Sequence, residues 1–161
     1  MLIKKYIVAV LFINIFLLSC KQKSAGEMAA IKTYAIRLKP GTDLKRSIQS
    51  FVNEKKLKAA WIVTCAGSLT DYNIRFANQQ DAGKNSGHFE IVSLTGTLSE
   101  NGSHMHISIS DSTGRTIGGH LQEGCIVYTT AEIIIQSSNK LLFKREKDGT
   151  TPWEELQIEE K

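Results

Sequence analysis

Several short motifs that identify common enzyme classes are missing from this 161-residue sequence. It has no Gly-x-Ser-x-Gly nucleophile elbow, no phosphate-binding P-loop and no Gly-x-Gly-x-x-Gly dinucleotide fingerprint. Interpretation as a hydrolase, an NTPase or a dinucleotide-dependent enzyme therefore lacks support. Internal repeats and low-complexity segments are absent as well.

Long runs of basic residues are also missing, since lysine and arginine never form a block of five or more. The formal net charge is +4, and removal of the first nineteen residues would lower it to +2, because that segment holds two lysines and no acid. So small an excess of positive charge is too weak to argue for nucleic acid binding.

Cysteine is scarce, and its spacing excludes two further kinds of site. The three cysteines, Cys20, Cys65 and Cys125, form no Cys-x-x-Cys pair, so neither a cysteine zinc cluster nor thioredoxin-like chemistry is supported. Cys65 and Cys125 lie in apolar, strand-like runs, which favours buried free thiols. An exported compartment would permit a disulfide between them, and this alternative stays open.

The beginning of the chain is typical of an export signal. A short basic region precedes an apolar run over residues 6–18, which is too short for a membrane span of about 20 residues. The sequence Leu-Leu-Ser-Cys then ends at Cys20 and resembles a bacterial lipoprotein signal. The alternative is an ordinary signal peptide or an anchor helix. We expect three parts: a lipoprotein signal peptide at 1–19, a polar tether at 20–30 and a single domain at 31–161.

Lipidation of Cys20 would place the protein in the cell envelope. Each buried methylene of an acyl chain contributes about 0.8 kcal/mol, and more than one chain gives stable anchoring. We therefore expect a protein that is tethered to a bacterial membrane, facing the periplasm or the exterior, and that does not thread through it. The sequence leaves the choice of membrane and leaflet open.

The rest of the chain predicts an α+β domain around a mostly antiparallel sheet. One clear helix is expected at about 43–57, because Leu44, Ile48 and Val52 recur at helical spacing after a Thr-Asp capping pair. Six or seven strands are expected, at 31–38, 59–69, 71–78, 88–100, 104–110, 125–136 and 140–146. A loop is expected at 79–87, and a short helix or packed tail at 151–158.

Three of the four histidines lie close together in the sequence. His104 and His106 are two apart in a strand pattern, so their side chains project from the same face with backbones about 7 Å apart. His120 is the third candidate, because the Asp-Ser-Thr-Gly turn at 111–114 folds the chain back and the preceding Gly-Gly pair has no side chains to obstruct an approach.

Three histidine ligands favour a particular kind of metal site. They leave one position of a tetrahedral zinc open for water or a small-molecule ligand. The sequence thus predicts one divalent metal ion per chain. Zinc is the metal that we expect, although iron, copper and nickel also bind well to imidazole. Below about pH 6.5 the affinity for metal should weaken, because free imidazoles protonate there. The alternative is a polar sheet face without an ion.

No reaction follows from the acidic residues, so enzyme activity stays undecided. A general base near the open metal position could be Glu90, Asp111, Glu123 or Glu132, and the sequence does not rank them. Glu132 lies in a strand expected to be buried, where its carboxylate needs a partner. It could accept a hydrogen bond that orients a ligating histidine, or serve as a structural acceptor at a subunit seam.

Ordered motifs through the middle of the chain resemble the PPC domain, the "plants and prokaryotes conserved" family, in its bacterial form. The matching segments are GHFEIVSLTGTLS at 87–99, SHMHISISDSTGRTIGGHLQEGC at 103–125 and TTAEIII at 129–135. With the start of the domain included, the resemblance covers residues 32–136. Each motif alone is weak, but their order makes the combination specific.

The resemblance implies a mainly antiparallel sheet flanked by helices, a homotrimer, and three histidines that lie close together. In the plant members the Phe-Glu segment supports partner binding, which makes His88, Phe89 and Glu90 candidates for a partner surface. Plant members also carry AT-hook motifs, and bacterial members have acquired a DNA-binding label by that association. This chain has no Arg-Gly-Arg-Pro core, and His88 replaces the family's arginine.

The sequence is therefore compatible with three functions. The first is a membrane-tethered, trimeric module that binds a metal and a small ligand. The second is a DNA-binding protein, which the charge, the missing AT-hook and the expected export disfavour. The third is an interaction or scaffold module without a metal ion.

Overall fold

Eight strands and one helix make up residues 30–161, the part of the chain that the computed structural model describes. The elements are β1 (Ile31–Leu38), α1 (Leu44–Glu54), β2 (Ala60–Arg75), β3 (Gly83–Ser99), β4 (Gly102–Ser110), β5 (Thr116–Leu121), β6 (Ile126–Ser138), β7 (Leu141–Glu146) and β8 (Glu155–Glu160). The expected signal peptide, the lipidation site Cys20 and the tether up to residue 29 lie outside the described residues.

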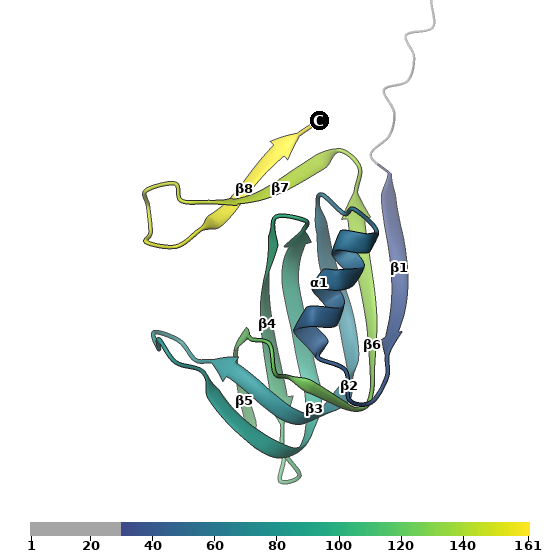
Figure 1. Ribbon diagram of the computed structural model, residues 1–161, viewed down its shortest axis with the longest axis vertical. Coiled ribbons are helices and arrows are strands. Elements are labelled where there is room, and N and C mark those ends of the chain that lie inside the picture. The colour runs from purple at the N-terminus through teal and green to yellow at the C-terminus, as the bar shows by residue number, and fades with distance from the viewer. Residues whose placement is uncertain (1–29) are drawn as a thin grey trace, which may run out of the picture.

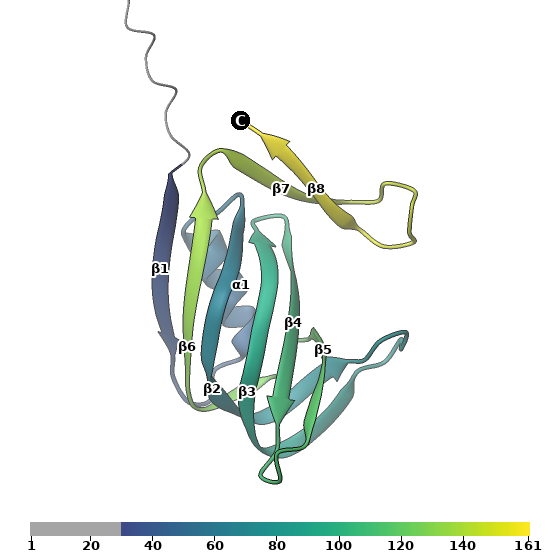
Figure 2. The ribbon, with the colours of Figure 1, turned by 180° about the vertical axis from the view of Figure 1, so that it is seen from behind.

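A six-stranded sheet with the order β1-β6-β2-β3-β4-β5 forms the body of the domain, and all of its neighbouring strands are antiparallel. Helix α1 lies across one face of this sheet (Figures 1 and 2). The expected α+β domain with a mainly antiparallel sheet is thus confirmed. No helix among residues 30–161 is both long enough and apolar enough to span a bilayer.

Helix α1 forms where the sequence places it and packs as its periodicity predicts. Leu44, Ile48 and Val52, spaced four residues apart, are fully buried in the core against the sheet. Asp43 caps the helix, since its Oδ1 accepts a hydrogen bond from the Arg46 amide at 2.9 Å. The helix is shorter than the expected 43–57, because Lys56 adopts a left-handed backbone with φ of 52° and ends it.

Strand β4 shows how the sheet separates its two faces. Met105, Ile107 and Ile109 are buried in the same core as α1, with exposed fractions of 2% or less. Because successive side chains of a strand alternate, His104 and His106 project from the opposite face, which no helix covers. The apolar side chains of β4 therefore anchor the strand in the core, and its polar side chains remain available for a binding site.

Two expectations about the β2–β3 region are wrong. Two strands were expected at 59–69 and 71–78, but residues 60–75 form the single strand β2, which continues through a register shift between Leu69 and Asp71. The segment 79–87 is a loop only in its first part, because β3 already begins at Gly83. The irregular register lets both strands bend and remain paired, which sequence alternation alone does not reveal.

Two other strands were not expected from the sequence. Residues 116–121 form β5, an edge strand that pairs with β4. Near the C-terminus, residues 155–160 form β8, which pairs with β7 in a separate two-stranded sheet, where a short helix or a packed tail was expected at 151–158. Both strands are short, and they depend on partners rather than on their own pattern.

The C-terminal end of β2 pairs with the edge strand β5 and so closes part of the sheet. Besides its long pairing with β3, β2 pairs with β5 through Ile74–Leu121 and Arg75–His120. This contact needs a residue without a side chain, because a Cβ on Gly119 would lie 2.5 Å from the carbonyl oxygen of Arg75. The closure thereby holds His120 at a fixed place beside β4.

Both cysteines of the described chain are buried and free, as expected. Burial raises the pKa of the Cys65 and Cys125 thiols to about 11. Cys125 accepts a hydrogen bond from the Asn73 amide at 3.2 Å. Both thiols therefore act as small core side chains and not as reactive nucleophiles.

Candidate metal centre

The three predicted histidines meet at one point on the uncovered face of the sheet. His104 Nε2 lies 3.1 Å from His106 Nε2 and 3.1 Å from His120 Nδ1. The third side of the triangle, between His106 Nε2 and His120 Nδ1, is 3.2 Å. We call these three residues the histidine triad.

Strand pairing explains why the triad forms. His106 and His120 are direct partners in the β4–β5 register, and His104 precedes His106 by two residues on the same face. The turn between the strands is closed by Asp111, whose Oδ1 accepts hydrogen bonds from the Thr113 and Arg115 amides at 2.8 and 3.1 Å. The predicted fold-back at 111–114 is thus present, and it places His120 opposite β4.

Hydrogen bonding alone does not account for a triangle of ring nitrogens. A ring nitrogen that carries hydrogen cannot accept, and one without hydrogen cannot donate. Any protonation pattern of three converging nitrogens therefore leaves at least one pair as two donors or two acceptors. A cation placed among three lone pairs removes this conflict, so the donor set fits a metal ion.

The size of the triangle also fits. Nitrogens bound at 2.0–2.1 Å to a tetrahedral zinc lie roughly 3.3–3.4 Å apart. The observed separations of 3.1–3.2 Å differ from this by only a few tenths of an ångström. His104 and His106 are exposed and His120 is half-buried, so the remaining coordination position faces open space.

The surroundings of the triad favour the neutral form of two of its imidazoles, His104 and His120. The pKa of His120 is lowered to about 4, chiefly by burial of the ring and then by the positive charge of Arg75. The pKa of His104 is also lowered, by burial first and by Arg145 second. Neutral imidazole is the form that binds metals, so these shifts favour coordination at neutral pH.

The acidic candidates lie elsewhere in the described chain. Glu132 is exposed on β6, which is separated from β4 by β2 and β3, so a single chain does not bring it to the triad. Glu123 pairs with Arg46 at 2.7 Å, and Asp111 is occupied in its turn. Glu90 is exposed on β3, paired with Ser110 at the far end of β4.

The predicted partner segment divides between the two faces of β3. His88 is exposed and stacks on Tyr128 with ring centroids 4.3 Å apart. Glu90 is exposed on the same face. Phe89, in contrast, is buried in the core and meets the ring of Tyr72 edge-on at 5.0 Å. The segment thus leaves His88 and Glu90 accessible at the surface, while Phe89 packs in the core.

Sequence analysis missed the charged residues nearest the triad. Arg75 is the β2 partner of His120. Arg145 and Glu155 come from the C-terminal hairpin, and their charges act on His104 in opposite directions. Their distance along the chain from His104 hides all three from any local motif. Arg75 is brought to the triad by the pairing of β2 with β5, and Arg145 and Glu155 by the C-terminal hairpin.

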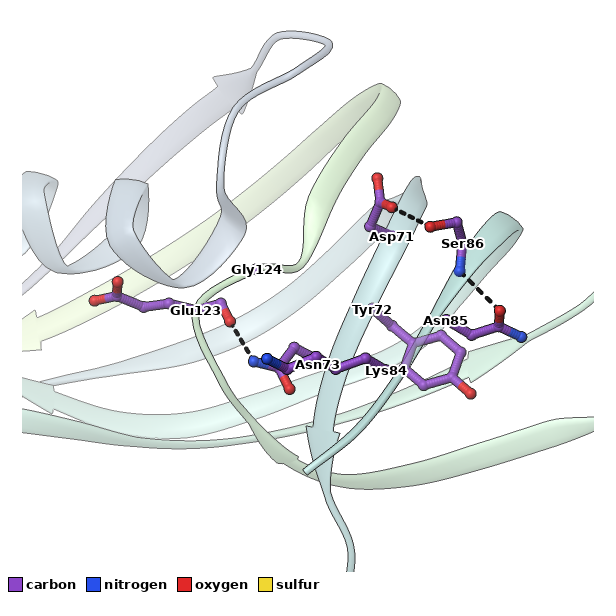
Figure 3. Close-up of a pocket in the computed structure, with 8 residues that line it drawn as sticks. All are labelled: Asp71, Tyr72, Asn73, Lys84, Asn85, Ser86, Glu123 and Gly124. Atoms are coloured by element: carbon purple, nitrogen blue, oxygen red, sulfur yellow. Dashed lines mark hydrogen bonds between the residues drawn. The ribbon is translucent and has the colours of Figure 1, made fainter. Parts of the chain in front are cut away.

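A separate groove of about 460 Å³ lies beside β2 and β3 (Figure 3). Within it the Asn73 side chain donates to the Glu123 carbonyl at 2.6 Å, and Ser86 donates to Asp71 at 2.6 Å. The residues that line it are Asp71, Tyr72, Asn73, Lys84, Asn85, Ser86, Glu123 and Gly124. No triad residue lines this groove, and Asn73 Oδ1 within it is buried without a hydrogen-bond partner. The triad is the better candidate site, because among the described residues it is the group of three side chains placed to hold a metal ion.

Together, the sheet and the triad define an antiparallel α+β domain with a candidate metal centre on its uncovered face. The chain belongs to the Plants and Prokaryotes Conserved (PCC) domain family, whose model matches residues 25–139. This confirms the resemblance to the PPC domain.

A curated relative and a solved structure are each 39% identical to this chain over the aligned residues. One is the Bifunctional protein GlmU of Synechococcus sp. strain JA-3-3Ab, aligned over 130 residues that make up 81% of this chain. The chain spans only about a fifth (21%) of that relative. The other is a hypothetical protein from Salmonella enterica, with a TM-score of 0.80 over 82% of this chain and 96% of that one.

Two more distant structures share the fold. A metal-containing protein from Archaeoglobus fulgidus is 26% identical, with a TM-score of 0.66 over 78% of this chain and 93% of that one. A proposed DNA-binding protein from Bacteroides thetaiotaomicron is 22% identical, with a TM-score of 0.69 over 81% of this chain and 97% of that one. The latter likeness concerns the fold alone.

Proposed function

We propose that this protein is a metal-binding module that holds one divalent ion per chain on the histidine triad, and that this ion is zinc. The observation that carries the proposal is the convergence of three ring nitrogens within 3.2 Å of one another. The metal-containing relative from Archaeoglobus fulgidus supports it. When bound, the ion supplies a Lewis-acid position that can accept a small ligand.

Metal analysis of protein purified without a histidine tag tests this proposal. We expect about one ion per chain in the wild type and none in the His106→Ala variant. His88→Ala is the matched control, because His88 is the one histidine of the sequence outside the triad. A wild-type protein that takes up no zinc from an excess, or a His88→Ala variant that loses the metal equally, would contradict the proposal.

The protein is further proposed to work as a homotrimer. Support comes from the uncovered face of the sheet, where Val63 on β2 and Val92 on β3 are 50% and 56% exposed. Apolar side chains on an open sheet face gain stability when a second surface covers them. Sedimentation equilibrium is expected to give three times the chain mass, and a monomer at micromolar concentration would contradict this assembly.

Anchoring to a membrane of the cell envelope completes the proposal. It rests on the Leu-Leu-Ser-Cys sequence that ends at Cys20 and on the apolar run before it. Labelling with a radioactive fatty acid in a bacterial host should mark the wild type and not the Cys20→Ser variant. Equal labelling of both, or of neither, would contradict lipidation at this residue.

DNA binding is the second candidate, since a structure with the same fold belongs to a proposed DNA-binding protein. The net charge of +4 over 161 residues gives it little electrostatic support. A salt-dependent gel shift at physiological ionic strength would favour it. A trimer that binds neither metal nor DNA would favour the third candidate, a scaffold module.

A further inference from the structure

The C-terminal hairpin, formed by β7 and β8, reaches toward the triad. It leaves the six-stranded sheet and crosses the end where β3 turns into β4 (Figures 1 and 2). Phe143 anchors it, being 7% exposed, with its amide donating to the Lys58 carbonyl at 2.9 Å. The hairpin lies beyond residues 25–139, the part that the family model matches.

Arg145 of β7 is fixed beside the triad by a hydrogen bond. Its guanidinium donates to Thr97 Oγ1 at 2.6 Å, and Thr97 is the β3 partner of His104. The guanidinium is thus held over the strand pair that carries His104, on the face where that ring projects. Its charge lowers the pKa of His104, second only to the effect of burial.

A second arginine lies beside the triad, and a tryptophan packs on it. Arg75 is the β2 partner of His120, and its guanidinium carbon lies 5.8 Å from the centre of the Trp153 ring. Trp153 belongs to the connection between β7 and β8 and is 64% exposed. An exposed tryptophan that rests on an arginine beside a metal site presents a flat apolar surface to a ligand.

The charges around the triad are unbalanced. Three neutral imidazoles leave the charge of a divalent ion uncompensated, and Arg75 and Arg145 add two positive charges. Among the described residues, Glu155 on β8 of the same hairpin is the acidic residue whose charge acts on His104, and it offsets one of these positive charges. The arrangement therefore favours an anion, and guanidinium groups match the two oxygens of a carboxylate.

We propose that the triad, Arg145, Arg75 and Trp153 form one binding site for a small organic acid that carries a flat apolar group. The carboxylate occupies the open coordination position and is received by the guanidinium groups, while the flat group lies against Trp153. This inference rests on the proposed metal site. It assigns the C-terminal hairpin the role of selecting the ligand.

Calorimetric titration of the zinc-loaded chain with three probes tests the inference. Benzoate carries both a carboxylate and a ring, acetate only the carboxylate, and inorganic phosphate a different anion. We expect benzoate to bind most tightly and to bind at least tenfold more weakly to the Arg145→Gln variant. Arg37→Gln is the matched control, because Arg37 also donates to a threonine hydroxyl, Thr130 at 3.1 Å, but lies on the β1 edge of the sheet.

Two further variants make the ring contact visible. Trp61→Phe leaves Trp153 as the one tryptophan of the chain, so its fluorescence should change with benzoate and saturate with the calorimetric affinity. Trp153→Ala should lower the affinity for benzoate to that for acetate. Because Trp153 is exposed, this variant should fold normally, and it tests the site even if Arg145→Gln does not fold.

The outcomes separate the two proposals. A wild type that takes up no zinc contradicts the metal site itself. The ligand site alone is overturned if the zinc-loaded wild type does not bind benzoate, or if the Arg145→Gln variant binds benzoate as tightly as the wild type does. Tighter binding of phosphate than of benzoate overturns the carboxylate assignment. Equal affinities for benzoate and acetate in the wild type overturn the role of Trp153.

Discussion

Substitution of Gly119 by alanine should separate His120 from the other two histidines without unfolding the domain. The added Cβ would lie 2.5 Å from the Arg75 carbonyl oxygen, whereas ordinary contacts begin at 3.4 Å. Strand β5 must therefore move from β2 by several tenths of an ångström, up to about 0.9 Å. The ring nitrogens are 3.1–3.2 Å apart, so a shift of this size displaces one ligand from a site whose bonds are defined to about 0.1 Å.

The expected effect on stability is moderate, and the effect on metal binding is larger. Overpacking at a strand contact costs about 1–3 kcal/mol, which urea unfolding of the metal-free protein measures. Zinc affinity, measured by competition with a chelator, should fall by at least about tenfold, or about 1.4 kcal/mol. The loss should appear as a smaller stabilisation by zinc, because metal that binds the folded state alone stabilises it in proportion to affinity.

Gly83→Ala serves as the control, because its added Cβ would also be crowded, at 2.6 Å, but against the side chain of Phe76 and not against the backbone of a neighbouring strand. That ring can rotate away, so the strands need not move apart. The reasoning is refuted if Gly119→Ala binds zinc as tightly as the wild type, or if Gly83→Ala weakens zinc binding to the same extent.

Three further outcomes are expected. In metal-free protein His120 should titrate near pH 4 by NMR and His104 below 6.5. Between these pH values and 6.5 the unfolded state binds more protons than the folded state, so the stability of the metal-free protein should fall as the pH drops through this window. A titration of His120 near 6.5 would contradict this. Asp43→Ala should cost about 2 kcal/mol in urea unfolding, since the carboxylate accepts from the Arg46 amide and from the Gly124 amide at 2.6 Å, and an unchanged midpoint would refute the cap. Cys65 and Cys125 should react with a thiol reagent only after unfolding, and rapid labelling of the native protein would show that they are not buried.

The sequence determined those parts of the protein that depend on neighbours along the chain. The spacing of Leu44, Ile48 and Val52 defined α1, and the alternation around His104 and His106 defined the two faces of β4. The meeting of these histidines with His120 was also predictable, because one turn of the chain separates them. In each case the interacting groups are a few residues apart, so local periodicity and turn chemistry carry the information.

Tertiary structure alone decided what surrounds the triad. Arg75 reaches His120 because β2 bends through its register shift and pairs with β5, and Arg145 arrives on a hairpin whose strands were not both expected. Strand order likewise places two strands between Glu132 and β4, although Glu132 follows His120 by only 12 residues in the sequence. Pairing between distant strands depends on bulges, closure and packing of the whole sheet, and these are properties that no short stretch of sequence encodes.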